Sequence, residues 1–85
     1  MYNENHIENL SNEVMYFRHY KGGIYKLIGF AKDSETLQEV VIYQAMYGNF
    51  SLWVRPKSMF FEKIIINNQL IQRFSLITKE EALCH

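Results

Sequence analysis

Trp53 and Arg55 are the two residues whose types and spacing most directly suggest chemistry. They lie two positions apart in a segment with strand-like alternation, so their side chains should share one face of a sheet. An indole beside a guanidinium can stack on a base or a proline ring, or bind a carboxylate-bearing ligand. The same alternation places Leu52 and Val54 on the opposite face, where we expect the core.

Other aromatic side chains could extend this pair into what we call the aromatic–Arg face. We define the face by His19, Tyr20, Tyr43, Tyr47, Trp53 and Arg55. A purely structural interpretation stands beside this one. In it, Trp53 covers one end of the fold and Arg55 forms a surface ion pair with Glu35 or Glu62, which contributes about 0–1 kcal/mol.

Two polar turns are weaker candidates. Ser34, Glu35 and Thr36 could hold a ligand hydroxyl or phosphate, or could close a turn by bonding to their own backbone. The turn Lys21–Gly23 after His19 could expose backbone N–H groups to an anion. No helix clearly begins after it, so it does not match a phosphate-binding loop of the Walker type.

Catalytic and metal-binding patterns are absent from the sequence. Cys84 lies in a tail, and Ser34 lacks the surroundings of an activated nucleophile. The histidines His6, His19 and His85 are too scattered for metal-ligand spacing. We therefore expect no metal and no cofactor, and leave the question of an enzyme open with a leaning against it.

Composition limits the class of protein. The 85 residues fit one domain, 48% of them are hydrophobic, and nine basic residues balance nine acidic ones. A nonspecific nucleic-acid binder usually has a basic excess, which this chain lacks. One cysteine, a polar N-terminus and no long apolar run predict a cytoplasmic protein that does not enter a membrane.

Hydrophobic spacing divides the chain into three parts. Residues 1–15 have helical spacing and predict a short helix or an arm; residues 16–78 predict a β-barrel domain; residues 79–85 predict a short C-terminal helical turn or tail. The expected strands are Met15–Tyr20, Ile24–Ala31, Val40–Tyr47, Ser51–Arg55, Glu62–Ile66 and Leu70–Leu76. Thr78 and Glu81 match a capping box at the start of the last turn.

Five or six short antiparallel strands joined by tight turns predict a closed barrel, which removes exposed edges. Gly29, inside the second strand, indicates a bulge or bend that lets a sheet curl. We expect alternation to continue through it, with Tyr25 and Leu27 on one face and Phe30 on the other. Pro56 followed by a short turn favours an SH3-like barrel, with a small sandwich as the alternative.

Five segments in a fixed order also resemble a known family. They are "HYKGGIYKLIGFA", "DSET", "VVIYQAMYG", "LWVRPKSMF" and "RF", and together they are similar to the bacterial family catalogued as domain of unknown function 1653 over about Tyr16 to Ile77. The resemblance implies a compact β-barrel domain and carries no established activity. This chain departs from the pattern at Asp33, where the family suggests His, and at Asn67–Gln69 and Gln72.

These observations predict a small binding module. Its ligand would be a protein or peptide segment, slightly favoured by the neutral charge, or a single-stranded nucleic acid. The alternative is a small enzyme or nucleotide-binding protein that uses the Ser34–Thr36 loop with Arg55 and Glu62. A third possibility is that the aromatic–Arg face is an oligomer contact, and we expect a monomer or a weak homodimer.

Overall fold

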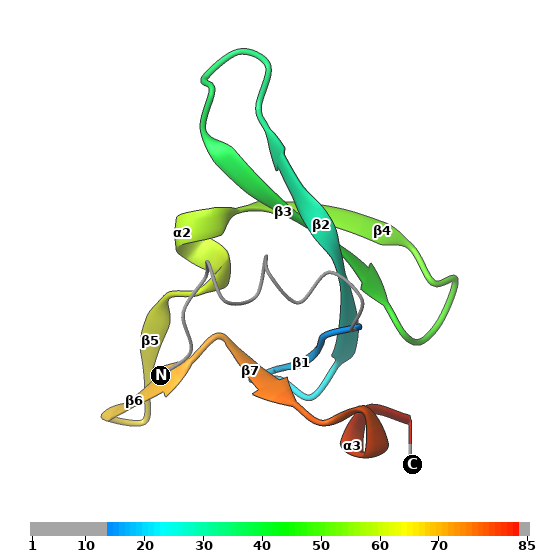
Figure 1. Ribbon diagram of the computed structural model, residues 1–85. Coiled ribbons are helices and arrows are strands. Elements are labelled where there is room, and N and C mark those ends of the chain that lie inside the picture. The colour runs from blue at the N-terminus through cyan, green and yellow to red at the C-terminus, as the bar shows by residue number, and fades with distance from the viewer. Residues whose placement is uncertain (1–13, 84–85) are drawn as a thin grey trace.

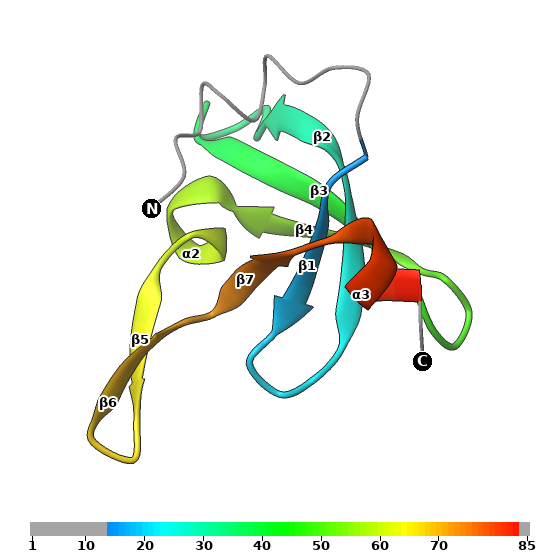
Figure 2. The ribbon, with the colours of Figure 1, turned by 60° about the horizontal axis from the view of Figure 1, so that its bottom comes forward.

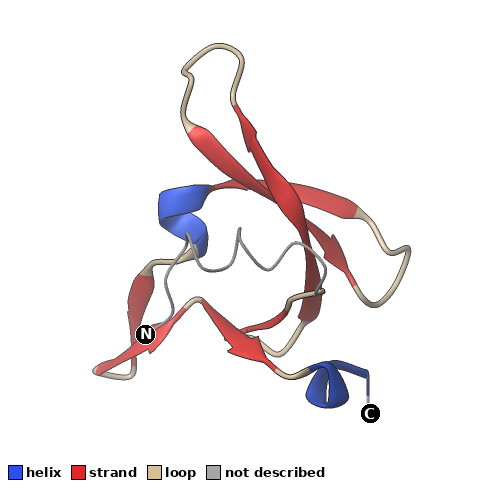
Figure 3. Ribbon diagram, viewed as in Figure 1, coloured by secondary structure: helices blue, strands red, loops and turns tan. Residues whose placement is uncertain are grey.

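Two antiparallel sheets and two short helices make up the computed structural model, which describes residues 14–83 (Figures 1 and 3). The strands are β1 (Tyr16–His19), β2 (Ile24–Lys32), β3 (Glu39–Ala45), β4 (Leu52–Pro56), β5 (Lys63–Ile66), β6 (Gln69–Gln72) and β7 (Phe74–Ile77), and the helices are α2 (Lys57–Phe60) and α3 (Lys79–Leu83). The mainly β prediction is confirmed. The expected N-terminal helix lies outside the described residues apart from positions 14 and 15, which are not helical.

The larger sheet is open, and the expected closed barrel is therefore wrong. Its strand order is β4-β3-β2-β1-β7, and the end strands β4 and β7 do not pair with each other. The chain between them forms α2 and the two-stranded β5–β6 ribbon, which extends away from the larger sheet (Figure 2). Phe60 of α2 is fully buried and its ring stacks on Phe74 of β7, with ring centroids 4.1 Å apart. A side-chain contact thus joins β7 to α2, the helix that follows β4, where strand pairing was expected.

The main core lies on the concave face of the larger sheet and is largely aromatic. Its buried members are Phe17, Val41, Tyr43, Phe60 and Phe74. Phe17 also meets Phe60 edge-on at 5.2 Å, and Tyr43 meets Phe74 at 5.4 Å. Such ring pairs contribute about 0.5–1.5 kcal/mol each beyond the burial of their surface. A core of this kind fixes the positions of the side chains at its rim.

A β-bulge in β2 changes which side chains face this core. Leu27 lies opposite Tyr43 and Gly29 lies opposite Ile42, so the register shifts at Ile28. The bend predicted from Gly29 is confirmed, but the predicted alternation is wrong after it. Because one extra residue reverses the alternation, Phe30 joins Leu27 against the core and Ile28 is exposed.

Strand β4 is the edge of the larger sheet, and its two faces differ from the prediction in one respect. Trp53 and Arg55 share the concave face with their partners Tyr43 and Val41, as expected. Leu52 and Val54 point to the convex face and are each 62% exposed, so their predicted place in the core is wrong. Among the described residues no layer covers that face of β4, since the core forms on its concave side.

The C-terminal turn has the capping box that the sequence predicts. The Thr78 backbone N–H donates to Glu81 Oε1 at 2.9 Å, and the Glu81 N–H donates to Thr78 Oγ1 at 3.0 Å. The capped helix α3 buries Ala82 against Tyr16 and Ile24. Neither α2 nor α3 has the length and apolar character of a membrane-spanning helix.

Candidate functional site

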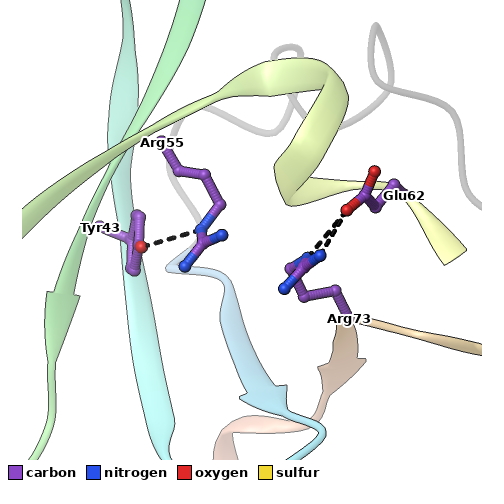
Figure 4. Close-up of polar contacts among 4 residues, drawn as sticks. All are labelled: Tyr43, Arg55, Glu62 and Arg73. Atoms are coloured by element: carbon purple, nitrogen blue, oxygen red, sulfur yellow. Dashed lines mark hydrogen bonds and ion pairs between the residues drawn. The ribbon is translucent and has the colours of Figure 1, made fainter. Parts of the chain in front are cut away.

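Arg55 is a half-buried cation that extends over the aromatic core. Its Nε donates to Tyr43 Oη at 3.3 Å (Figure 4). Its guanidinium carbon lies 5.7 Å from the centre of the Phe74 ring. Within residues 14–83 no carboxylate lies at ion-pair distance from it, so the predicted pairing with Glu35 or Glu62 is wrong. The N–H groups on its two terminal nitrogens are therefore available to a ligand.

His19 borders the same Phe74 ring from β1. The two ring centroids are 4.9 Å apart, and the imidazole also stacks at a tilt on Tyr20 at 4.5 Å. His19 Nδ1 accepts a hydrogen bond from the Lys21 backbone N–H at 3.2 Å. In the neutral ring this bond places the proton on Nε2, which is then a hydrogen-bond donor.

The surroundings of His19 are electropositive. Burial lowers the pKa of His19 below 6.5, and Arg55, Arg73 and Lys21 lower it further. Arg73 is neutralised in part, because its Nε and Nη2 both donate to Glu62 Oε2 (Figure 4). Three cations therefore act on the imidazole and only Arg73 is paired with a carboxylate, in a chain whose net charge is zero. Such a site favours an anionic ligand.

A tyrosine pair continues the face beyond His19. The hydroxyls of Tyr25 and Tyr47 are hydrogen-bonded to each other, and burial together with this bond raises the pKa of Tyr25 to about 12. Gly23 lies against both rings: a Cβ there would be 3.1 Å from a ring carbon of each. The two rings, His19 and Gly23 line a pocket of about 660 Å³ between the β1–β2 turn and the start of the β3–β4 turn.

The structure brings together most of the aromatic–Arg face. Tyr43 contacts both Arg55 and Tyr25, and Tyr25 contacts Tyr47, which is 50% exposed. Trp53 is the cross-strand neighbour of Tyr43 and is 52% exposed. Ring contacts thus connect Tyr43 through Tyr25 to Tyr47 at the His19 pocket, and Trp53 lies beside Tyr43 on the neighbouring strand.

Ser34, Glu35 and Thr36 lie elsewhere, in the loop of the projecting β2–β3 hairpin (Figure 1). The Asp33 carboxylate accepts from the backbone N–H groups of Glu35 and Thr36 at 2.8 and 3.2 Å, which lowers the pKa of Asp33. The Thr36 hydroxyl accepts from the Gln38 N–H at 3.2 Å. These bonds support the turn interpretation of this segment.

The β1–β2 turn gives little support to a phosphate cradle. The N–H of Gly22 donates to the His19 carbonyl at 2.7 Å, and that of Lys21 donates to the imidazole. Both donors are therefore used within the turn. Among the described residues, no group of three or more His, Cys, Asp or Glu side chains could hold a metal ion.

Three residues of the site were not predicted from the sequence. Phe74 supplies the ring that Arg55 and His19 share, Arg73 adds a second guanidinium, and Tyr25 links Tyr43 to Tyr47. Arg73 and Phe74 come from the end of the chain, and only the pairing of β7 with β1 brings them to His19. The "RF" dipeptide in the family pattern was the one sequence signal for them.

Comparisons with known proteins agree with this fold. Residues 15–76 match the model of the family described as protein of unknown function (DUF1653), so the chain belongs to that family. A crystal structure of a DUF1653 protein from Bordetella bronchiseptica is similar, with a TM-score of 0.68 and 27% sequence identity. The match covers 76% of this chain and 86% of that one. No curated protein matches this chain.

Proposed function

We propose that this member of the DUF1653 family is a binding module whose aromatic–Arg face recognises an acidic segment of another protein. The observation that carries the proposal is Arg55, a half-buried guanidinium over Phe74 with no carboxylate at ion-pair distance in residues 14–83. A half-buried charge without a counter-ion is costly unless something binds it. A carboxylate can accept two parallel N–H bonds from the terminal nitrogens of such a guanidinium.

His19 supports an anionic ligand in a second way. In the neutral ring Nδ1 accepts the bond from the Lys21 N–H, and Nε2–H is the one remaining donor of the imidazole. A neutral donor adds a hydrogen bond without adding to the repulsion among the cations nearby. An anion that reaches both Arg55 and His19 would also offset the charges of Arg73 and Lys21.

A single-stranded nucleic acid is the second candidate, because two rings of the face are about half exposed. Tyr47 and Trp53 could each stack on a base. The neutral charge of the chain favours the protein ligand, since nucleic-acid binding draws on several phosphate contacts. A nucleic acid carries a charge on every phosphate of its backbone and a polypeptide backbone is neutral, so the salt dependence of the binding affinity distinguishes the two ligands.

The enzyme alternative has no assembled site within residues 14–83. Ser34 and Glu35 line a pocket with Ile42 and Val54, whose side chains point to the convex face. Arg55 points to the concave face, and Glu62 is engaged by Arg73. The pocket of Ser34 and Glu35 thus lies on the opposite face of β4 from Arg55.

The proposal also covers the fold type, the cellular compartment and the oligomeric state. Pro56 and the one-turn helix α2 after the fourth strand are features that we associate with an SH3-like fold, here with an open sheet. We place the domain in the cytoplasm because its single cysteine fits a reducing compartment. We expect a monomer or a weak homodimer.

Amide NMR on the full chain tests the function. The probes are the acidic peptide acetyl-Val-Glu-Val-Glu-Val-amide and a ten-nucleotide oligouridylate, each titrated at low and high salt. Shifts at Tyr43, Tyr47, Trp53 and Arg55 with the peptide would support the proposal. Shifts with the oligonucleotide alone, lost at high salt, would establish the second candidate instead, and no shift with either probe would overturn both.

A further inference from the structure

We propose that the outer edge of β4 accepts an extended polypeptide strand, so that the ligand lengthens the larger sheet by one strand. The inference rests on the proposed function, because the added strand would bring its acidic side chain to the aromatic–Arg face. It goes further than the proposed function because it assigns the backbone of the partner a separate binding site, the outer edge of β4.

The register of β3 and β4 shows which backbone groups of β4 are unused. The Ala45 N–H donates to the Ser51 carbonyl at 2.9 Å, which makes Ala45 and Ser51 a hydrogen-bonded pair. Bonded pairs alternate along an antiparallel ladder, so the peptide groups of Trp53 face β3 and those of Leu52 and Val54 face outward. In residues 14–83 no strand pairs with that outer side, since β4 ends the strand order.

Only part of this edge carries features that block strand addition. Natural edge strands are protected by charges, proline, inward-pointing charged residues, bulges or a covering segment. Pro56 and the inward-turned Arg55 are features of this kind at the C-terminal end of β4, whereas Leu52 and Val54 are apolar, exposed and, within residues 14–83, not covered by another segment. Pro56 lacks an N–H and limits pairing to the stretch before it.

Backbone chemistry identifies the class of partner. Outward N–H and C=O groups in strand spacing are matched by the backbone of another extended polypeptide, the β-augmentation mode of peptide recognition, and not by a nucleic acid. An added strand lies about 5 Å from β4 and alternates its side chains between the two faces. An acidic residue on the concave side lies beside Trp53 within reach of Arg55, and its apolar neighbours lie on Leu52 and Val54.

The test compares three peptides on the full chain. One is acetyl-Val-Glu-Val-Glu-Val-amide. The other two are matched controls with N-methyl groups either on the valines or on the glutamates, so that each isomer lacks the backbone donors of one edge and keeps both carboxylates. We follow amide hydrogen exchange at Leu52 and Val54 by NMR. We expect the unmodified peptide to slow exchange at both amides at least tenfold. We also expect it to bind at least tenfold more tightly than the N-methyl isomer whose methyl groups lie on the edge that pairs with β4.

The other outcomes separate the two proposals. Equal binding of the parent peptide and both N-methyl isomers, with shifts at Arg55 and none at Leu52 or Val54, would overturn the edge proposal and leave the proposed function standing. No binding of any peptide would overturn both. Slow exchange at Leu52 and Val54 in the free protein, together with a dimer by sedimentation, would show that a second copy occupies the edge and would overturn the proposal.

Discussion

At the scale of single residues, His19 connects the site to pH. Its pKa is lowered by burial and then by Arg55, Arg73 and Lys21, while Glu62 pairs with Arg73. The Tyr20 ring stacks on the imidazole, and Tyr25 and Tyr47 line the same pocket as His19. The unfolded chain therefore binds more protons than the folded chain just below pH 6.5. Folding should gain stability as the pH rises through this window and lose it as the pH falls.

We predict that the free energy of unfolding increases between the folded pKa of His19 and about pH 6.5, and then levels off. Urea titrations at several pH values, with the His19 pKa measured by NMR, provide the check. In His19→Gln this part of the slope should disappear. A slope of the opposite sign in the wild type would contradict the assigned environment.

Gly23 gives a second residue-scale prediction. A Cβ at this position would lie 3.1 Å from ring carbons of Tyr25 and Tyr47, so in Gly23→Ala the two rings must shift slightly and the variant should lose about 1 kcal/mol of stability. Gly29→Ala is the matched control, because the space there is open and its φ is not positive. Equal unfolding midpoints for the two variants would contradict this account.

At the scale of elements, the capping box was predictable and the outer faces of the strands were not. Thr78 and Glu81 form a local motif whose spacing alone defines it, whereas the position of Phe30 depends on one extra residue at Ile28. The exposure of Leu52 depends on whether another layer covers the sheet. Neither a bulge position nor a missing layer can be deduced from alternation.

The capping box supports an element-scale prediction. Thr78→Ala removes the side-chain acceptor for the Glu81 N–H and should destabilise the domain by about 1 kcal/mol, measured by urea unfolding. Ser75→Ala, on the exposed side of β7, is the control. The Thr78 backbone N–H, and after it the Thr78 side chain, lowers the pKa of the Glu81 carboxyl, so this contribution is present above the usual pKa of Glu and is lost as the pH falls through the lowered value. A cost for Thr78→Ala no greater than for the control would count against the cap.

At the scale of the whole molecule, an aromatic contact joins β7, at one end of the open sheet, to α2, which follows the strand at the other end. The strand pattern predicted the antiparallel sheet and most of the aromatic–Arg face, since Trp53, Arg55 and Tyr43 are neighbours on β3 and β4. It could not predict Arg73 and Phe74, which reach His19 only through the β1–β7 pairing. Long-range pairing of this kind depends on the packed core and leaves no local signal.

Phe60 is the residue through which this arrangement can be tested. It is fully buried between Phe17 and Phe74, so Phe60→Ala should cost about 3–5 kcal/mol, a large part of the total stability of a small domain. Met59→Ala changes an exposed neighbour in the same helix and should cost far less. Thermal and urea unfolding followed by circular dichroism would give both values. A loss below about 1 kcal/mol for Phe60→Ala would show that α2 does not hold the ends of the sheet together.

The most direct measurement of the central claim is calorimetric titration of the acidic peptide into the wild-type chain and into Arg55→Leu. Leucine removes the guanidinium and keeps an apolar contact with Phe74, so folding stability should stay within about 1 kcal/mol of the wild type or rise. A hydrogen bond to a charged group contributes about 1.5–3 kcal/mol, so affinity should fall by roughly ten- to a hundredfold. Unchanged affinity in a folded Arg55→Leu variant would contradict the claim that Arg55 binds the ligand.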